Sequence, residues 1–286
     1  MSLIYINPYA FAAAAASFLD TYPGALAAYS LRSLSSSVTN VVKVRRSNDN
    51  AESDFTAAEV SDGTLASWVG AGNNGFVTTW YDQSGNGQNA VQATSGSQPQ
   101  IVSSGSVITD GTNAKPSISY SGGAKILSAT LGSSPNARSN MTLISVVSPT
   151  LTILNNASRA FMIMPETGSW GSIFHNVCTD SFRYRFGSGQ SGNNQTIVRT
   201  ITSAITQTFK EGTAEYARIN GTDYTRGTTA LATTANTSTT LNFGPGDNAG
   251  VPFVGKASEA FIYLSSQRTS ASAIEANINA YYGVFA

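Results

Sequence analysis

Three side chains at alternate positions carry oxygen atoms that could do chemistry. Asp82, Ser84 and Asn86 lie in the segment DQSGNG, directly after a run of aromatic and β-branched residues. Their carboxylate, hydroxyl and amide oxygens could bind a hard cation or the hydroxyl groups of a sugar. The segment lacks the closing bidentate glutamate of a calcium loop, so the simpler interpretation is a polar turn that ends a strand. Neither a metal ion nor another cofactor is expected.

Aromatic residues next to this turn could stack on a sugar ring. Trp80 and Tyr81 immediately precede Asp82, and Trp68 and Trp170 are the other two tryptophans of the chain. An aromatic ring can stack on the apolar face of a sugar, while carboxylate and amide groups bond its hydroxyls. The candidate glycan-binding residues are therefore Trp80, Tyr81, Asp82, Gln83 and Asn86.

The predicted strands contain no pair of carboxylates with the spacing of a glycosidase site. A retaining glycosidase holds two carboxyl groups about 5–5.5 Å apart, and side chains two positions apart share one face of a strand. Neither Glu-x-Asp nor Glu-x-Glu occurs in a predicted strand. The other acidic residues considered are Glu166, Asp180, Glu211, Glu215 and Glu259. His175 and Cys178 form a His-x-x-Cys spacing, which without further ligands indicates core or loop residues. No catalytic residue is assigned.

Composition excludes several classes of partner. The chain of 286 residues has 16 Lys and Arg against 16 Asp and Glu, so its net charge is zero. No basic surface for nucleic acid is expected, and no run is long and apolar enough for a membrane span. The single cysteine, Cys178, cannot form an internal disulfide. The surface must be covered by Ser, Thr, Asn, Gln and Gly, as is typical of β-rich extracellular or virion proteins.

The first 21 residues are expected to form an attachment arm outside the main domain. The segment MSLIYINPYAFAAAAASFLD is apolar and has neither Lys nor Arg, so it lacks the positive start of a secretory signal. Its alanine-rich half could form a short helix that needs a surface to pack on. This surface is either the protein's own domain or a neighbouring subunit. The residues expected to dock are Ile4, Tyr5, Ile6, Tyr9, Phe11, Phe18 and Leu19.

Residues 22–286 are predicted to form one all-β domain, a two-sheet antiparallel jelly-roll sandwich. Short apolar or alternating runs recur with turn signals every 8–12 residues or so, which is typical of sandwiches. No helix long enough for a parallel crossover lies between most of them. The clearest of these runs span 38–46, 76–81, 141–149 and 257–264. The Asn-Gly pair at 220–221 predicts a tight hairpin.

One clear helix is predicted, at 270–282. Ser272 and Glu275 have the spacing of a capping box, and Gly283 can end the helix. Residues 64–69 fit a short helix. Residues 25–34 fit a helix and a strand equally well.

Several segments resemble known families. AYSLRSL, VVKVRRSNDNAESDF and FVTTWYDQSGNGQNAVQ, with QPQIV after them, are similar to the opening of the catalytic domain of family 54 α-L-arabinofuranosidases, and to a set of bacteriophage virion proteins that share this block. Later segments resemble the concanavalin A-like lectin and glucanase superfamily, laminin-G domains included; they are KPSISYSGGAKIL, MTLISVV, EYARINGTDY, TLNFG, GKASEAFIYL and IEANINAYYG. The resemblance implies a two-sheet jelly roll in which one curved sheet can bind glycans, and it does not by itself imply activity.

These observations predict a non-enzymatic bacteriophage virion surface protein, such as a capsid decoration, head-fibre or tail protein, whose arm anchors it to other virion subunits. The first alternative is a glycan-binding adhesin with a host-surface glycan as its partner. The second is an arabinofuranosidase-like glycoside hydrolase, although the catalytic pair of those enzymes matches no position clearly. The expected location is the virion surface, and a homotrimer is expected by analogy with displayed virion proteins.

Overall fold

The computed structural model describes residues 17–121, 124–135, 138–151, 160–166, 169–186, 195–228, 238–244 and 252–286. The strands are β1 (Ala25–Ser30), β2 (Asn40–Arg46), β3 (Glu52–Thr56), β4 (Gly75–Trp80), β5 (Ala90–Val91), β6 (Gln100–Ser103), β7 (Ser106–Val107), β8 (Thr109–Asp110), β9 (Lys115–Pro116), β10 (Ile118–Ser119), β11 (Leu127–Thr130), β12 (Asn140–Pro149), β13 (Ala160–Glu166), β14 (Ser169–Val177), β15 (Ser181–Phe186), β16 (Gln195–Val198), β17 (Ala204–Glu211), β18 (Ala214–Ile219), β19 (Thr222–Thr228), β20 (Thr240–Phe243) and β21 (Gly255–Tyr263). The helices are α1 (Phe18–Thr21), α2 (Ala57–Ser61), α3 (Thr64–Val69) and α4 (Ala271–Tyr282), with short 3₁₀ turns η1 (Ser95–Ser97) and η2 (Arg268–Ser270).

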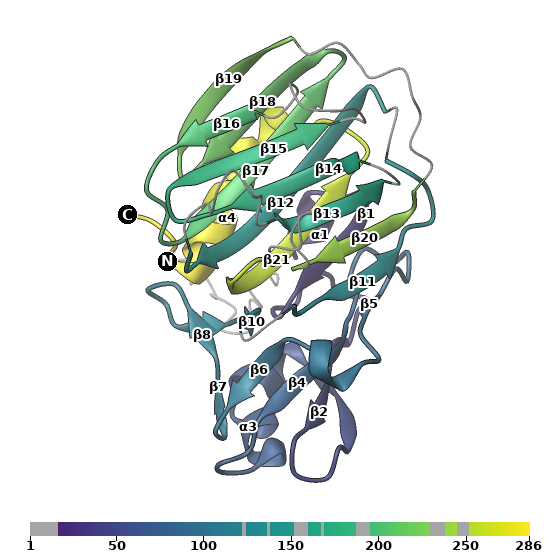
Figure 1. Cartoon of the computed structure of the whole chain (residues 1–286), viewed down its shortest axis with the longest axis vertical. Coiled ribbons are helices and arrows are strands. Elements are labelled where there is room, and N and C mark those ends of the chain that lie inside the picture. The colour runs from purple at the N-terminus through teal and green to yellow at the C-terminus, as the bar shows by residue number, and fades with distance from the viewer. Residues whose placement is uncertain are drawn as a thin grey trace, which may run out of the picture.

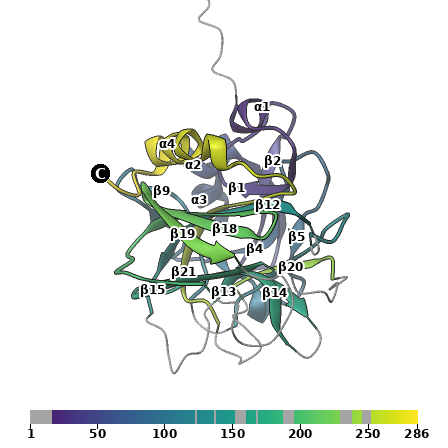
Figure 2. The same ribbon diagram turned by 90° about the horizontal axis from the view of Figure 1, so that it is seen from above.

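Two layers of antiparallel strands form the sandwich (Figure 1). In one layer β1, β21, β12, β17, β18 and β19 pair in this order. In the other, β11, β20, β13, β14, β15 and β16 pair in this order. Figure 2 shows α4 and α1 on the outer face of the first layer. The predicted class, an antiparallel two-layer β-sandwich with a C-terminal helix, is therefore confirmed.

The long strand β12 is apolar on both faces because both faces are covered. Leu143 and Val147 belong to the core between the two layers, whereas Ile144 and Val146 pack in the cluster that includes α4. A strand with one solvated face would instead alternate apolar and polar residues. The apolar majority at 141–149 is thus explained by α4, which packs on the outer face of this sheet.

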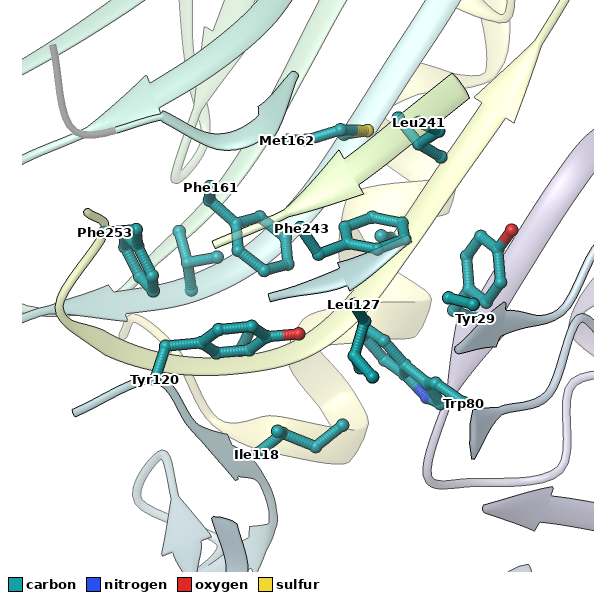
Figure 3. Packing of buried hydrophobic residues seen from close by; sticks show 14 of the residues in the cluster. Tyr29, Trp80, Ile118, Tyr120, Leu127, Phe161, Met162, Leu241, Phe243 and Phe253 are labelled. Carbon is teal, nitrogen blue, oxygen red and sulfur yellow. The ribbon is translucent and has the colours of Figure 1, made fainter. Parts of the chain in front are cut away.

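A lobe made of β2, β3, β4, β6, α2 and α3 lies below the sandwich in Figure 1 and joins it through an aromatic cluster. Phe243 of β20 packs against Tyr29, Trp80 and Phe161, with ring centroids 5.1, 5.7 and 5.5 Å away (Figure 3). All four rings are fully buried. Trp80 therefore works as a core residue at the junction between the lobe and the sandwich.

The segment 25–34, which fits a helix and a strand equally, forms a strand over Ala25–Ser30, and the residues after Ser30 leave the strand. The backbone of β1 pairs with β21 from Ala25 opposite Tyr263 to Ser30 opposite Glu259. This partner is far away in the sequence, so no local pattern could identify it. Long-range pairing decided between two local states of similar energy.

The C-terminal helix is confirmed, but its predicted cap is wrong. The N-cap of α4 is Ser270, without a side-chain cap hydrogen bond, and Gly283 ends the helix in the left-handed conformation at φ 63°. Glu275 does not reach back to the helix start; its carboxylate binds Arg218 and the backbone N–H of Gly221. Glu275 therefore forms a tertiary ion pair with Arg218 instead of the predicted capping box.

The expected attachment arm is only partly covered by the structure. Ile4, Tyr5, Ile6, Tyr9 and Phe11 lie outside the described residues. Phe18 and Leu19 are described and buried: the Phe18 ring lies 4.8 Å from that of Phe261, and the Leu19 N–H donates to the Leu34 carbonyl at 2.8 Å. Helix α1 thus packs on the domain itself. The boundary at residue 21 and the docking role of the first residues stay predictions.

Candidate functional site

The carboxylate of Asp82 ties the central turn to β1. Its Oδ1 accepts hydrogen bonds from the backbone N–H groups of Ala28 and Ser84, both at 2.9 Å. Its Oδ2 accepts from the Ser84 hydroxyl at 2.7 Å and from the Gln88 N–H at 3.0 Å. A carboxylate has about four acceptor positions, and Asp82 is only 5% exposed. Its hydrogen-bonding capacity is therefore used inside the fold.

The two amide side chains of the turn have similar roles. Gln83 is 1% exposed; it accepts from the Leu34 N–H at 2.8 Å and donates to the Arg32 carbonyl at 3.0 Å. Asn86 donates to the Leu26 carbonyl at 2.9 Å. These bonds satisfy backbone groups of β1 and of the loop after it, which would otherwise be buried without partners.

The tryptophans and Tyr81 differ in exposure. Trp80 is fully buried and has no free face for a sugar ring. Tyr81 is half-buried, and its hydroxyl donates to Asp54 at 2.6 Å. Trp68 is partly buried against the core, and the side chain of Trp170 lies outside the described part of the chain.

Of the five residues predicted to bind a glycan, only Tyr81 and Asn86 reach the surface. Residue types showed what the turn could bind, but they did not show that Trp80, Asp82 and Gln83 point inward. The structure explains these three residues through packing and backbone hydrogen bonds alone. The glycan-binding role of the five stays a prediction.

A Glu-x-Asp pair does occur on a strand, contrary to the expectation that no strand carries such a pair, because the sequence pattern did not identify β3. Glu52 and Asp54 are exposed and lie two positions apart on β3. Asp54 accepts the Tyr81 hydrogen bond and lies 3.8 Å from the Lys43 Nζ. Burial and the bond to Asp54 raise the pKa of Tyr81, so its hydroxyl stays protonated and donates. Asp54 is thus engaged by a hydroxyl and an ammonium group on an exposed strand.

Most other acidic residues considered as catalytic are engaged elsewhere. Glu259 pairs with Arg32 at 2.6 Å, and Glu211 pairs with Arg268 at 3.2 Å. Glu215 is buried at 3% exposure, opposite Lys210 on the neighbouring strand. Glu166 lies at the end of β13, and Asp180 lies in the turn before β15.

A pocket of about 270 Å³ opens between β18, β19 and the start of α4. We call it the β18–β19 pocket; its lining includes Phe209, Tyr216, Arg218, Asp223, Arg268 and Ser272. The hairpin turn at Asn220 and Gly221 has φ values of 45° and 80° and brings Arg218 opposite Asp223. The Asn-Gly signal could have located this pair from the sequence, whereas nothing local indicates that Arg268 lies beside it.

Arg218 is held rigidly at the inner end of this pocket. Its Nε donates to Glu275 at 2.6 Å and its Nη1 to Asp223 at 2.8 Å. Burial disfavours the charged form, but the hydrogen bonds to Asp223 and Glu275 outweigh it and raise the pKa of Arg218. Glu275 also accepts from the Gly221 N–H at 2.8 Å. Helix α4 therefore clamps the hairpin and orients the arginine.

Arg268 and Tyr216 form the outer side of the pocket. The Arg268 guanidinium carbon lies 3.7 Å from the centre of the Tyr216 ring, and its Nη1 lies 3.2 Å from Glu211. The pocket thus combines an aromatic ring, guanidinium donors and the carboxylate acceptor of Asp223. Ligand sites that fix a polyhydroxylated ring use this combination of groups.

His175 and Cys178 are both fully buried. The His175 Nδ1 lies 3.2 Å from the Ser145 hydroxyl, and its Nε2 lies 2.6 Å from the Thr208 hydroxyl. No group of three or more His, Cys, Asp or Glu among the described residues could hold a metal ion. In the same part of the chain no helix has the length and apolar character to cross a membrane.

Burial of His175 predicts a loss of stability in mild acid. It lowers the pKa of His175 to about 3, against about 6.5 in an unfolded chain. The unfolded chain therefore binds the extra proton first as the pH falls below about 6.5, and the folded state loses roughly 3 kcal/mol between pH 7 and pH 4. Urea unfolding at both pH values should show this loss in the wild type. His175→Gln should remove most of it, and an unchanged slope in this variant would contradict the assignment.

Solved structures of arabinofuranosidases share this fold. An arabinofuranosidase complexed with arabinofuranosyl-α-1,2-xylobiose matches with a TM-score of 0.67 and 15% identity, over 90% of this chain and 63% of that chain. A family 54 α-L-arabinofuranosidase soaked with a cyclic sulfate inhibitor matches with a TM-score of 0.65 and 14% identity, with the same coverage. The chain thus spans less than two thirds of these enzymes, and at this identity the match shows the fold alone. No family model and no curated protein match the sequence.

The expectation of a bacteriophage virion structural protein is wrong. The matching structures described above are arabinofuranosidases, so the fold is that of the arabinofuranosidase part of the resemblance. The virion interpretation rested on a neutral, hydroxyl-rich surface and on a sequence block shared by both groups. A surface of this composition carries little charge, but it does not specify a biological role. The β-sandwich has the fold of these arabinofuranosidase structures; the expected trimer and location are tested by none of these observations.

Proposed function

We propose that this chain is a carbohydrate-active domain that recognises glycans. The observation that carries the proposal is the match to arabinofuranosidase structures over 90% of the chain. Fold alone does not define function, so the β18–β19 pocket supplies the second support. It offers an aromatic ring beside fixed donors and an acceptor, which is the chemistry that binds sugar hydroxyls and C–H faces together.

Hydrolysis of α-L-arabinofuranosides is the second candidate, and the β3 pair favours it. Glu52 and Asp54 are exposed on one strand face beside Tyr81, a position from which two carboxyls could flank a glycosidic bond. Binding remains the better-supported function because the Tyr81 hydroxyl and the Lys43 ammonium already engage Asp54 on an exposed strand, whereas the β18–β19 pocket offers a concave site.

Two assays on the full chain test these functions. We expect calorimetric titration with arabinofuranosyl-α-1,2-xylobiose to show binding, and 4-nitrophenyl α-L-arabinofuranoside to show no turnover. Absence of binding to this and other neutral oligosaccharides at millimolar concentration would contradict the proposal. Turnover that disappears in both Glu52→Gln and Asp54→Asn, but persists in the surface control Asp49→Asn, would establish the hydrolase instead.

A further inference from the structure

The two arginines of the β18–β19 pocket differ in how firmly they are held. Arg218 has a side chain only 12% exposed and is fixed by Glu275 and Asp223 at 2.6 and 2.8 Å. Arg268 is 46% exposed, and its partner Glu211 is 33% exposed. Exposed ion pairs and exposed cation–π contacts are weak. A ligand can therefore displace Arg268 from Tyr216 far more easily than it can move Arg218.

Both arginines of the pocket already have acidic partners before any ligand arrives. Arg218 already faces Asp223 and Glu275, and Arg268 already faces Glu211. Neither guanidinium is left for an anionic sugar. The Asp223 side chain is 76% exposed, so it repels a carboxylate or sulfate group and can accept hydrogen bonds from hydroxyls.

The pocket also has the size for a single sugar ring. Its volume of about 270 Å³ lies just below the range of roughly 300–1,000 Å³ that holds drug-sized ligands. Its aromatic side is Tyr216, which Phe209 backs from β17 at the neighbouring position in the sheet. The Arg268 guanidinium lies over this ring, with its carbon 3.7 Å from the ring centre.

We infer that the β18–β19 pocket binds one neutral sugar residue, whose C–H face stacks on Tyr216 in the place of the Arg268 guanidinium. Asp223 accepts hydrogen bonds from the sugar hydroxyls, and the fixed Arg218 guanidinium lines the inner end of the site. Arg268 is thus a displaceable cover that competes with the ligand. This inference rests on the proposed glycan binding and assigns it to a site.

The test compares two opposite substitutions at the covered ring. Titration with arabinofuranosyl-α-1,2-xylobiose should show binding weakened about tenfold or more by Tyr216→Ala, because the stacking face is lost. Arg268→Ala should tighten binding roughly two- to fivefold, because the competing guanidinium is gone. Tyr216→Phe keeps the ring and should bind like the wild type. The same xylobiose with a glucuronic acid branch should bind more weakly than the neutral ligand.

Arg46 provides the matched control, since its guanidinium lies 4.7 Å from the Trp68 ring centre and pairs with Asp49 at 2.7 Å, away from the pocket. Arg46→Ala should leave affinity unchanged. Each variant's thermal midpoint identifies a substitution that merely unfolds the protein. Weaker binding in Arg268→Ala, or wild-type affinity in a folded Tyr216→Ala, would overturn the inference while glycan binding stands. A wild type that binds no neutral glycan would overturn both.

Discussion

Glu259→Ala is expected to lower the free energy of unfolding by about 3–5 kcal/mol, the usual effect of breaking a buried ion pair. Glu259 is fully buried in β21, and its Oε1 lies 2.6 Å from the Arg32 Nε. It also accepts hydrogen bonds from the hydroxyls of Ser30 at 2.8 Å and Tyr282 at 3.2 Å. One carboxylate therefore joins β1, β21 and α4.

The large effect comes from the groups that the substitution leaves behind. Burial disfavours the charged Arg32, but Glu259 more than offsets this and raises the pKa of Arg32. Without the carboxylate, the guanidinium keeps its charge in a largely dry site, and two hydroxyls lose their acceptor. Replacing both ends, as in Arg32→Met with Glu259→Ala, should therefore restore part of the lost stability.

Urea unfolding followed by tryptophan fluorescence measures these differences. The m-value shows whether the variants and the wild type expose similar amounts of surface on unfolding. Asp49→Ala is the control: Asp49 pairs with Arg46 at 2.7 Å but is 45% exposed, so a much smaller loss than for Glu259→Ala is expected. Equal stabilities for Glu259→Ala and the wild type would refute a structural role for the pair.

Asp82→Ala should also cost about 3–5 kcal/mol. The substitution removes the acceptor of three backbone N–H groups, those of Ala28, Ser84 and Gln88. Ala28 and Gln88 are buried, and a buried donor left without a partner costs about 1–3 kcal/mol. Ser84 is partly exposed and can turn to water, so the total falls short of three full penalties.

Asp82→Asn separates structure from ligand binding at the same position. It keeps one acceptor oxygen, so its stability should lie between those of the wild type and Asp82→Ala, as chemical denaturation would show. Because Asp82 faces the backbone, glycan affinity should stay at the wild-type value in the folded Asn variant. A folded Asp82→Asn protein that no longer binds glycan would instead support the original hypothesis of a sugar site at the turn.

The sequence-based predictions succeeded where neighbouring residues decide the outcome. The aromatic and β-branched run before Asp82 forms β4, and Asn220 with Gly221 makes the predicted hairpin turn. Alternation and turn chemistry act within a few residues, so the sequence displays them directly. They were enough to identify an antiparallel sandwich.

Local sequence patterns gave no information where residues far apart in the chain share one contact. Trp80 and Asp82 are candidate glycan-binding residues by type, and the structure buries both where β1, β20 and the central turn meet. The spacing of Glu275 from Ser272 predicted a helix cap, but in the structure the hairpin places Arg218 beside Glu275. Polar and aromatic types are equally suited to bind a ligand or to satisfy a neighbour inside the fold.

Local pattern therefore settled that this chain is an antiparallel β-protein with a neutral surface, a tight hairpin and a terminal helix. The direction of each polar side chain, and with it the move of the candidate site from the central turn to the β18–β19 pocket, was decided only by tertiary structure. The physical reason is that burial and hydrogen-bond partnership arise from strand pairing between distant segments, such as β1 with β21, where Ser30 and its partner Glu259 are 229 positions apart. No window of sequence contains both partners.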